Sequence, residues 1–84
     1  MNNEEILATV MSVFKEILDN EQIVLVRETT AGDIEEWDSL SHIHLVVAIE
    51  KKFGIRFTSS QIQSWRNVGE MIDSIRDRIK LLNC

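Results

Sequence analysis

Residues 38–54 read DSLSHIHLVVAIEKKFG, and this stretch decides the fold. Asp38 stands where a helix cap is expected, because its side-chain oxygen can accept hydrogen bonds from backbone N–H groups of the first turn. Apolar residues then recur as far as Phe53, and the next residue, Gly54, is of the type that commonly ends a helix. The stretch therefore predicts a helix from Ser39 to about Phe53.

The apolar residues of this helix form two stripes on a wheel of about 100° per residue. One stripe, about 100° wide, is enough for one contact in a bundle, and it consists of Leu45, Val46, Ile49 and Phe53. The other lies on a separate side and consists of Leu40, Ile43 and Val47. Two interpretations stay open: a bundle that surrounds this helix, or a partner protein or hydrophobic cargo that meets the second stripe.

Three further helices are expected around this one. The first has apolar residues at helical spacing over residues 6–18, behind Asn2 or Asn3 as its cap. A short third helix of one or two turns follows the cap candidates in residues 58–60. The fourth follows Asn67, a capping-box residue, and runs to about residue 81.

Residues 19–38 lack this helical pattern. Their four consecutive apolar residues, 23–26, suit a short strand, but an isolated pair of strands is marginal in water. We therefore predict a long loop here. The fold class is all-α: a four-helix bundle with three longer helices, one short third helix and a long loop between helices one and two. Whether those two helices run parallel or antiparallel stays open.

The length and composition exclude several classes of protein. With 84 residues, we expect one domain, residues 1–84, with one thin core and little room for a deep catalytic cleft. The net charge of −5 disfavours nucleic acid as a partner. The longest apolar run, residues 45–49, is too short to span a membrane, and the N-terminus lacks the basic start of a signal peptide. The single cysteine, Cys84, leaves no intrachain disulfide. We expect a cytoplasmic monomer.

Charge is distributed unevenly along the chain. The ten acidic and two basic residues of segment 1–38 give it a net charge of −8, whereas the four acidic and seven basic residues of segment 39–84 give it +3. Within the first segment, residues 28–38 contain five carboxylates and no basic residue. The sign of the charge therefore changes at the start of the predicted second helix.

Ser39 occupies the first position of that helix. A hydroxyl there is exposed, and a phosphate ester on it would lie near the free N–H groups and the positive end of the helix dipole. The simpler alternative is that Asp38 and Ser39 only cap the start of the helix, as most Asp-Ser pairs do.

Residues 38–55 resemble an acyl carrier protein around its prosthetic-group serine. The shared features are the D-S-L triplet, the order of apolar residues, an acidic residue near the helix end and an F-G-I exit. The resemblance continues through Val68, Ile72 and Ile75 and covers nearly the whole chain.

The resemblance implies a carrier rather than an enzyme. A phosphopantetheinyl transferase would attach 4′-phosphopantetheine from coenzyme A to Ser39, and the arm's thiol would hold an acyl group as a thioester. Asp38 would cap the helix and help the transferase to dock. The second helix would be the docking surface, so that partner or acyl contacts fall on Leu40, Ile43, Val47, Glu50 and Trp37.

The chain also departs from carriers of fatty-acid synthesis. It has Glu-Glu-Trp before Asp38 where those carriers are glycine-rich, and Ser41, His44 and Lys51 where they usually have carboxylates. The W-D-S-L form resembles specialised, stand-alone carriers served by an acyl-loading ligase or synthase and downstream acyl-processing enzymes. Two alternatives stay open: an aminoacyl or peptidyl carrier, and an unmodified helical interaction module.

Five other residues have simpler interpretations. Trp37 and Trp65 suit the core, although Trp37 also suits contact with the arm. His42 and His44 point about 200° apart on a helix, so they cannot bind one metal ion together, and we expect both to be solvated. Cys84 is expected to be a tolerated free thiol.

Overall fold

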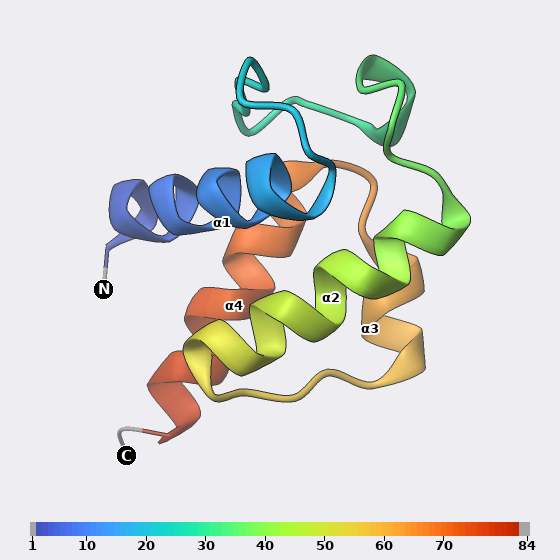
Figure 1. The fold of residues 1–84 in the computed structure, drawn as a ribbon. Coiled ribbons are helices and arrows are strands. Elements are labelled where there is room, and N and C mark those ends of the chain that lie inside the picture. Colours follow the sequence, from blue (N-terminus) through green and yellow to red (C-terminus); the bar gives the residue numbers. More distant parts are fainter. Residues whose placement is uncertain (1, 83–84) are drawn as a thin grey trace.

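The computed structural model describes residues 2–82 and places five elements in them (Figure 1). They are α1 (Asn3–Ile17), the 3₁₀ turn η1 (Ala31–Asp33), α2 (Ser39–Phe53), α3 (Ser59–Ser64) and α4 (Val68–Leu82). No strand occurs within residues 2–82. The predicted all-α fold with a short third helix and a long first connection is confirmed. The expected free thiol of Cys84 lies outside the described residues.

Local capping explains where α1 and α3 begin and where α2 ends. The Asn2 side chain accepts from the N–H of Glu5 at 2.9 Å, in a reciprocal capping box at the start of α1. Thr58 accepts from the N–H of Gln61 at 3.1 Å at the start of α3. Gly54 ends α2 in the left-handed region, with φ 68°, where an L side chain is strained.

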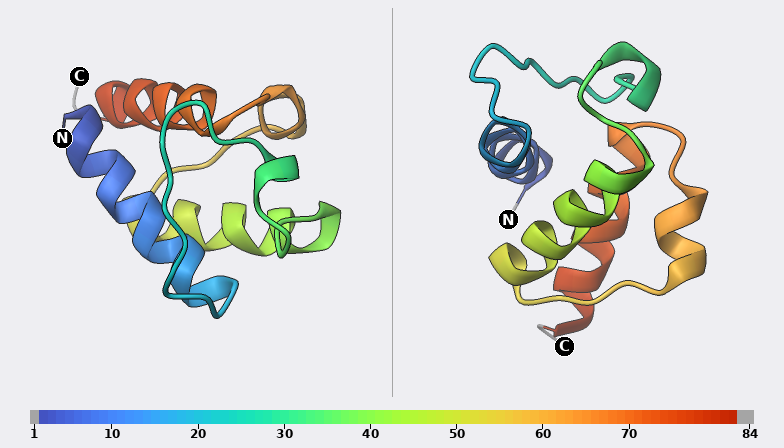
Figure 2. Two further views of the ribbon diagram at one scale, coloured as in Figure 1. Left: turned by 90° about the horizontal axis from the view of Figure 1, so that it is seen from above. Right: turned by 45° about the vertical axis from the view of Figure 1, so that its right-hand side comes forward.

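Helix α1 packs against both α2 and α4. In Figures 1 and 2, α1 and α2 cross the molecule in opposite directions at an oblique angle, which answers the question of their orientation. Their shared core contains the fully buried side chains Ile6, Val10, Phe14, Leu45 and Ile49, together with Val68, Met71, Ile72 and Ile75 from α4. The short helix α3 flanks α2 on the other side (Figure 2).

The long loop is anchored to the core by alternate residues. Ile23 and Leu25 are buried, whereas Val24 and Val26 are 75% and 50% exposed. The segment therefore alternates as a strand does, but it pairs with no other strand in the described chain. Apolar anchoring without a strand partner is what the sequence predicted.

Backbone hydrogen bonds fasten this loop to the start of α4. The carbonyl of Arg27 accepts from the N–H of Gly69 at 2.8 Å, and the carbonyl of Thr29 accepts from the N–H of Val68 at 2.9 Å. These bonds satisfy N–H groups that the first turn of a helix leaves without intrahelical partners. A Cβ on Gly69 would lie 3.1 Å from the Arg27 carbonyl oxygen, which is tighter than ordinary van der Waals contact, so glycine suits this close approach.

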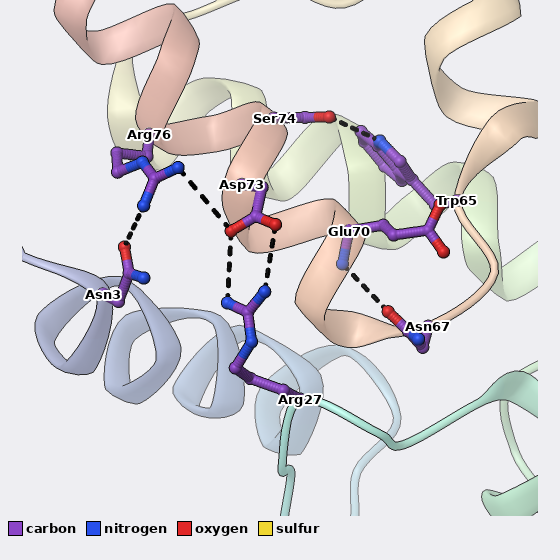
Figure 3. Close-up of polar contacts among 8 residues, drawn as sticks. All are labelled: Asn3, Arg27, Trp65, Asn67, Glu70, Asp73, Ser74 and Arg76. Atoms are coloured by element: carbon purple, nitrogen blue, oxygen red, sulfur yellow. Dashed lines mark hydrogen bonds and ion pairs between the residues drawn. The ribbon is translucent and has the colours of Figure 1, made fainter.

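Side chains reinforce the same junction (Figure 3). The Arg27 guanidinium donates to both carboxylate oxygens of Asp73, at 3.0 and 3.2 Å. Arg76 lies 3.9 Å from Asp73 and donates to Asn3 at 3.2 Å, which links the loop, α4 and α1. The hydrogen bonds from Arg27 hold the pKa of Asp73 below its usual value.

Within residues 2–82, no helix combines the length and the apolar character needed to cross a membrane.

Candidate functional site

Asp38 organises the start of α2. Its carboxylate accepts from the N–H of Ser41 at 2.8 Å and from the N–H of Leu40 at 3.0 Å, while its own N–H donates to the Ser41 hydroxyl oxygen at 2.8 Å. These contacts, with the Ser41 N–H first, lower the pKa of Asp38. The prediction that Asp38 caps this helix is confirmed, and the cap is a carboxylate at neutral pH. The N–H groups of Leu40 and Ser41 are not free for a phosphate, however, because Asp38 already occupies them.

Two hydroxyls lie close together in this first turn, and they differ in their contacts. The Ser41 hydroxyl donates to the Glu36 carbonyl at 2.9 Å and accepts from Asp38. The Ser39 hydroxyl makes no hydrogen bond with any of residues 2–82, and its residue is exposed. Ser39 is therefore accessible to a modifying enzyme, whereas Ser41 belongs to the cap.

A hollow of about 680 Å³ lies beside Ser39, between the loop, α2 and α3. Its lining includes the aromatic rings of Trp37, His42 and Trp65, and the apolar side chains of Ile43 and Ile62. A hollow of similar volume, about 670 Å³, lies along α1, and its lining includes no residue of α2 or α3. The hollow beside Ser39 is thus the one that a group attached to α2 can reach.

Aromatic rings form one wall of this hollow. Trp37 is 8% exposed and packs edge-on against Phe14 at 4.9 Å, so its interpretation as a core residue is correct. Its indole N–H donates to Nδ1 of His42 at 3.1 Å. Trp65 packs edge-on against His42 at 6.1 Å and donates to the Ser74 hydroxyl at 2.8 Å (Figure 3).

The expectation that both histidines are solvated is wrong for His42. It is half-buried between two tryptophan rings, while His44 is exposed. The ring environment of His42 is assembled from separate parts of the sequence, so no local pattern indicated it. Within residues 2–82, no cluster of three or more His, Cys, Asp or Glu side chains is arranged to hold a metal ion.

The second apolar stripe of α2 is uncovered. Leu40, Ile43 and Val47 are 67%, 58% and 43% exposed, whereas Leu45, Val46 and Ile49 are buried. The interpretation in which the bundle alone surrounds α2 is therefore wrong. Three apolar side chains at i, i+3 and i+7 face solvent next to Ser39.

Glu50 lies far from Ser39, near the end of α2. One oxygen of its carboxylate accepts from the N–H of Phe57 at 2.9 Å and so holds the connection between α2 and α3. This internal contact was not predicted, because it joins residues seven apart that no capping rule connects. The structure brings Ser39, Asp38, Leu40, Ile43 and Trp37 together but leaves Glu50 at the other end.

Comparisons with known proteins agree with this arrangement. Residues 8–75 match the protein family described as Phosphopantetheine attachment site. An acyl carrier protein from Cyanidium caldarium is 35% identical over 80 residues, which cover 94% of this chain and 92% of that protein. One from Acidothermus cellulolyticus is 31% identical over 75 residues, 89% of each chain. The solved structure of holo acyl carrier protein from Geobacter metallireducens is similar with a TM-score of 0.84 and 37% identity, over 89% of this chain and 86% of that one.

Proposed function

Because this chain belongs to the acyl carrier protein family, we propose that Ser39 is the residue to which its 4′-phosphopantetheine arm is attached. Members of this family are carriers rather than enzymes, and the fold of this chain is theirs. When attached, the arm would supply a terminal thiol, the group that can hold an acyl cargo as a thioester. The residues of the chain itself present, orient and shelter that arm.

The observation that carries the proposal is the exposed hydroxyl of Ser39 at the border of the hollow, which makes no hydrogen bond with any of residues 2–82. The other hydroxyl of this turn, that of Ser41, is engaged by the cap. The hollow offers aromatic rings beside Ser39, and it adjoins the uncovered stripe of α2 because Ile43 belongs to both. An arm on Ser39 can therefore lie against the protein or extend toward an enzyme that docks on α2.

Helix geometry also suits the phosphate of the arm. The positive end of the α2 dipole favours an anion at its first residue. The N–H groups of Leu40 and Ser41 already donate hydrogen bonds to the Asp38 carboxylate. We therefore assign the phosphate no direct hydrogen bonds from these two backbone groups. The attached ester stays exposed, where solvent screens the repulsion between its charge and Asp38.

Intact-mass measurement tests the attachment. The full chain is incubated with coenzyme A and a phosphopantetheinyl transferase of broad specificity, and we expect a mass gain of one phosphopantetheinyl group. The Ser39→Ala variant should gain nothing. Ser59→Ala is the matched control, because Ser59 is also the exposed first residue of a capped helix; this variant should be loaded like the wild type.

We further infer that the protein serves a dedicated pathway in the cytoplasm, as a monomer loaded by its own ligase or synthase. The feature that supports a specialised role is α2, whose exposed face carries His44 and Lys51 instead of carboxylates. An acyl cargo is favoured over an aminoacyl one because no glycine stands directly before Asp38, where Glu35, Glu36 and Trp37 lie instead. Loading assays with labelled fatty acids and amino acids, using ligases encoded beside the gene, decide between these cargoes.

A further inference from the structure

The exposed stripe of α2 ends in positive charge. Lys51 lies four residues after Val47, so it continues the line of Leu40, Ile43 and Val47 along the same face. Lys51 and Arg56 are both exposed, and together with Val47 they line a shallow hollow of about 310 Å³. Within residues 2–82, neither cation lies within 4.0 Å of a carboxylate in an ion pair.

The one carboxylate in this hollow offsets only one of the two positive charges. Glu50 lines the same hollow, but one of its oxygens accepts from the N–H of Phe57 and its side chain is half-buried. The end of α2 therefore presents two solvent-facing cations beside an apolar surface. These cations belong to the segment 39–84, which has a net charge of +3 although the whole chain has −5.

The opposite end of the helix carries the reverse charge. Glu35, Glu36 and Asp38 are exposed just before Ser39. Lys51 is twelve residues further along α2, which corresponds to roughly 18 Å at 1.5 Å per residue. That separation exceeds the Debye length of about 8 Å at physiological ionic strength. The acidic and basic ends of α2 therefore interact separately with the surface of a docked partner.

We propose that α2 docks in one fixed orientation on a partner protein whose binding face is apolar at its centre and acidic where it meets Lys51 and Arg56. This inference rests on the proposed function, because the partner it describes is an enzyme that acts on the group attached to Ser39. It states the chemistry by which such an enzyme recognises α2. The carboxylates of Glu35, Glu36 and Asp38, at the other end of α2, would then face basic side chains near the active site of the partner. Charge complementarity of this kind fixes register and speeds association more than it adds affinity.

A protein partner fits these observations better than an anionic membrane. The carboxylates beside Ser39 and the net charge of −5 repel anionic lipid head groups. Only three apolar side chains are exposed on this face of α2, and they form a narrow stripe rather than the broad face of a helix that lies in a membrane.

Two synthetic helical peptides with the same leucine face test the proposal. One carries glutamates beside the leucines, the other lysines at the same positions, and each is titrated into the ¹⁵N-labelled full chain before arm attachment. We expect the glutamate peptide to shift the amide resonances of Val47, Lys51 and Arg56. Lys51→Glu and Arg56→Glu should each weaken binding of this peptide by more than about threefold, because each removes one exposed charge pair and adds repulsion from the peptide's glutamates. Lys80→Glu is the matched control, since Lys80 is an exposed cation in the last turn of α4, and it should bind like the wild type.

Three results would overturn the proposal. One is stronger binding of the lysine peptide to the second half of α2, and another is equal weakening by Lys51→Glu and Lys80→Glu. The third is binding to phosphatidylglycerol vesicles that both α2 substitutions abolish, which would assign this face to membranes. Because the titrations use the chain without its arm, their outcome is independent of whether Ser39 is the attachment residue.

Discussion

The indole Nε1 of Trp37 donates a hydrogen bond to Nδ1 of His42 at 3.1 Å. The other ring nitrogen, Nε2, lies 3.4 Å from the carbonyl oxygen of Ile62. Since Nδ1 accepts, the neutral ring carries its proton on Nε2, where it points to that carbonyl. His42 thereby connects the residue two positions before Ser39 with α3, on the wall of the hollow beside the proposed attachment site.

This arrangement predicts the tautomer of His42. In long-range ¹H–¹⁵N spectra of the neutral ring, Nδ1 should show the shift of an unprotonated nitrogen and Nε2 that of a protonated one. Trp37→Phe removes the donor, so the two tautomers should mix and the free energy of unfolding should fall by about 1 kcal/mol. Trp65→Phe serves as control, because the indole of Trp65 donates to Ser74 instead. A proton on Nδ1 in the wild type would refute the assignment.

Replacement of Gly69 by alanine should loosen the long loop. The new methyl group would lie 3.1 Å from the Arg27 carbonyl oxygen and 3.2 Å from the Arg27 Cβ, inside a buried junction. We expect the free energy of unfolding to fall by about 1–3 kcal/mol, as for other overpacked sites. Gly32→Ala is the control, since its nearest neighbour would be the Thr30 hydroxyl oxygen at 3.7 Å. Urea denaturation measures both, and equal stability of the two variants would contradict the close approach.

The ion pair between Arg27 and Asp73 should contribute little despite its two hydrogen bonds. The two side chains are 47% and 40% exposed, so solvent screens their attraction. A double-mutant cycle with Arg27→Gln and Asp73→Asn should give a coupling free energy of about 0.5 kcal/mol that shrinks with added salt. A coupling energy well above 1 kcal/mol, or one indifferent to salt, would mean that the pair is more desolvated than its exposure indicates.

Acid should destabilise the fold through Asp38 and Asp73. Hydrogen bonds from Ser41 and from Arg27, respectively, lower the pKa values of these two carboxyls below the ordinary 3.8. In the folded protein they lose their protons at lower pH than in the unfolded chain, so the stabilisation is present above 3.8 and disappears as pH falls through the lowered values.

Urea denaturation at a series of pH values below about 5 measures this effect. Asp73→Asn should show a shallower loss of stability with acid than the wild type. Asp77→Asn is the matched control in the same helix, since Asp77 is exposed and takes no part in the ion pair of Arg27 with Asp73. If the Asp73→Asn and Asp77→Asn curves coincide with that of the wild type, the lowered pKa of Asp73 is not linked to folding.

Sequence reasoning predicted those features of the fold that local interactions determine. Asn2, Asp38 and Thr58 cap helices through hydrogen bonds to residues two or three positions away, and Gly54 ends α2 through its own backbone conformation. Such signals lie within one turn of the chain, so a single sequence contains them. The two stripes of α2 followed from helical periodicity in the same way.

The features that the sequence did not indicate depend on distant residues. The loop is fastened by carbonyls of Arg27 and Thr29 to N–H groups near the start of α4. His42 is half-buried because Trp37 and Trp65 approach it from the loop and from the residue after α3. Neither arrangement has a sequence signature, since each requires the packed fold to bring its partners together.

The attachment of the arm to Ser39 is tested most directly by locating the modification. After loading with coenzyme A and transferase, trypsin should release the peptide of residues 28–51, which contains Ser39 and Ser41. Fragmentation of this peptide should place the phosphopantetheinyl group on Ser39, with Ser41 unmodified. A group located on Ser41, or a loaded protein whose 28–51 peptide remains bare, would contradict the assignment.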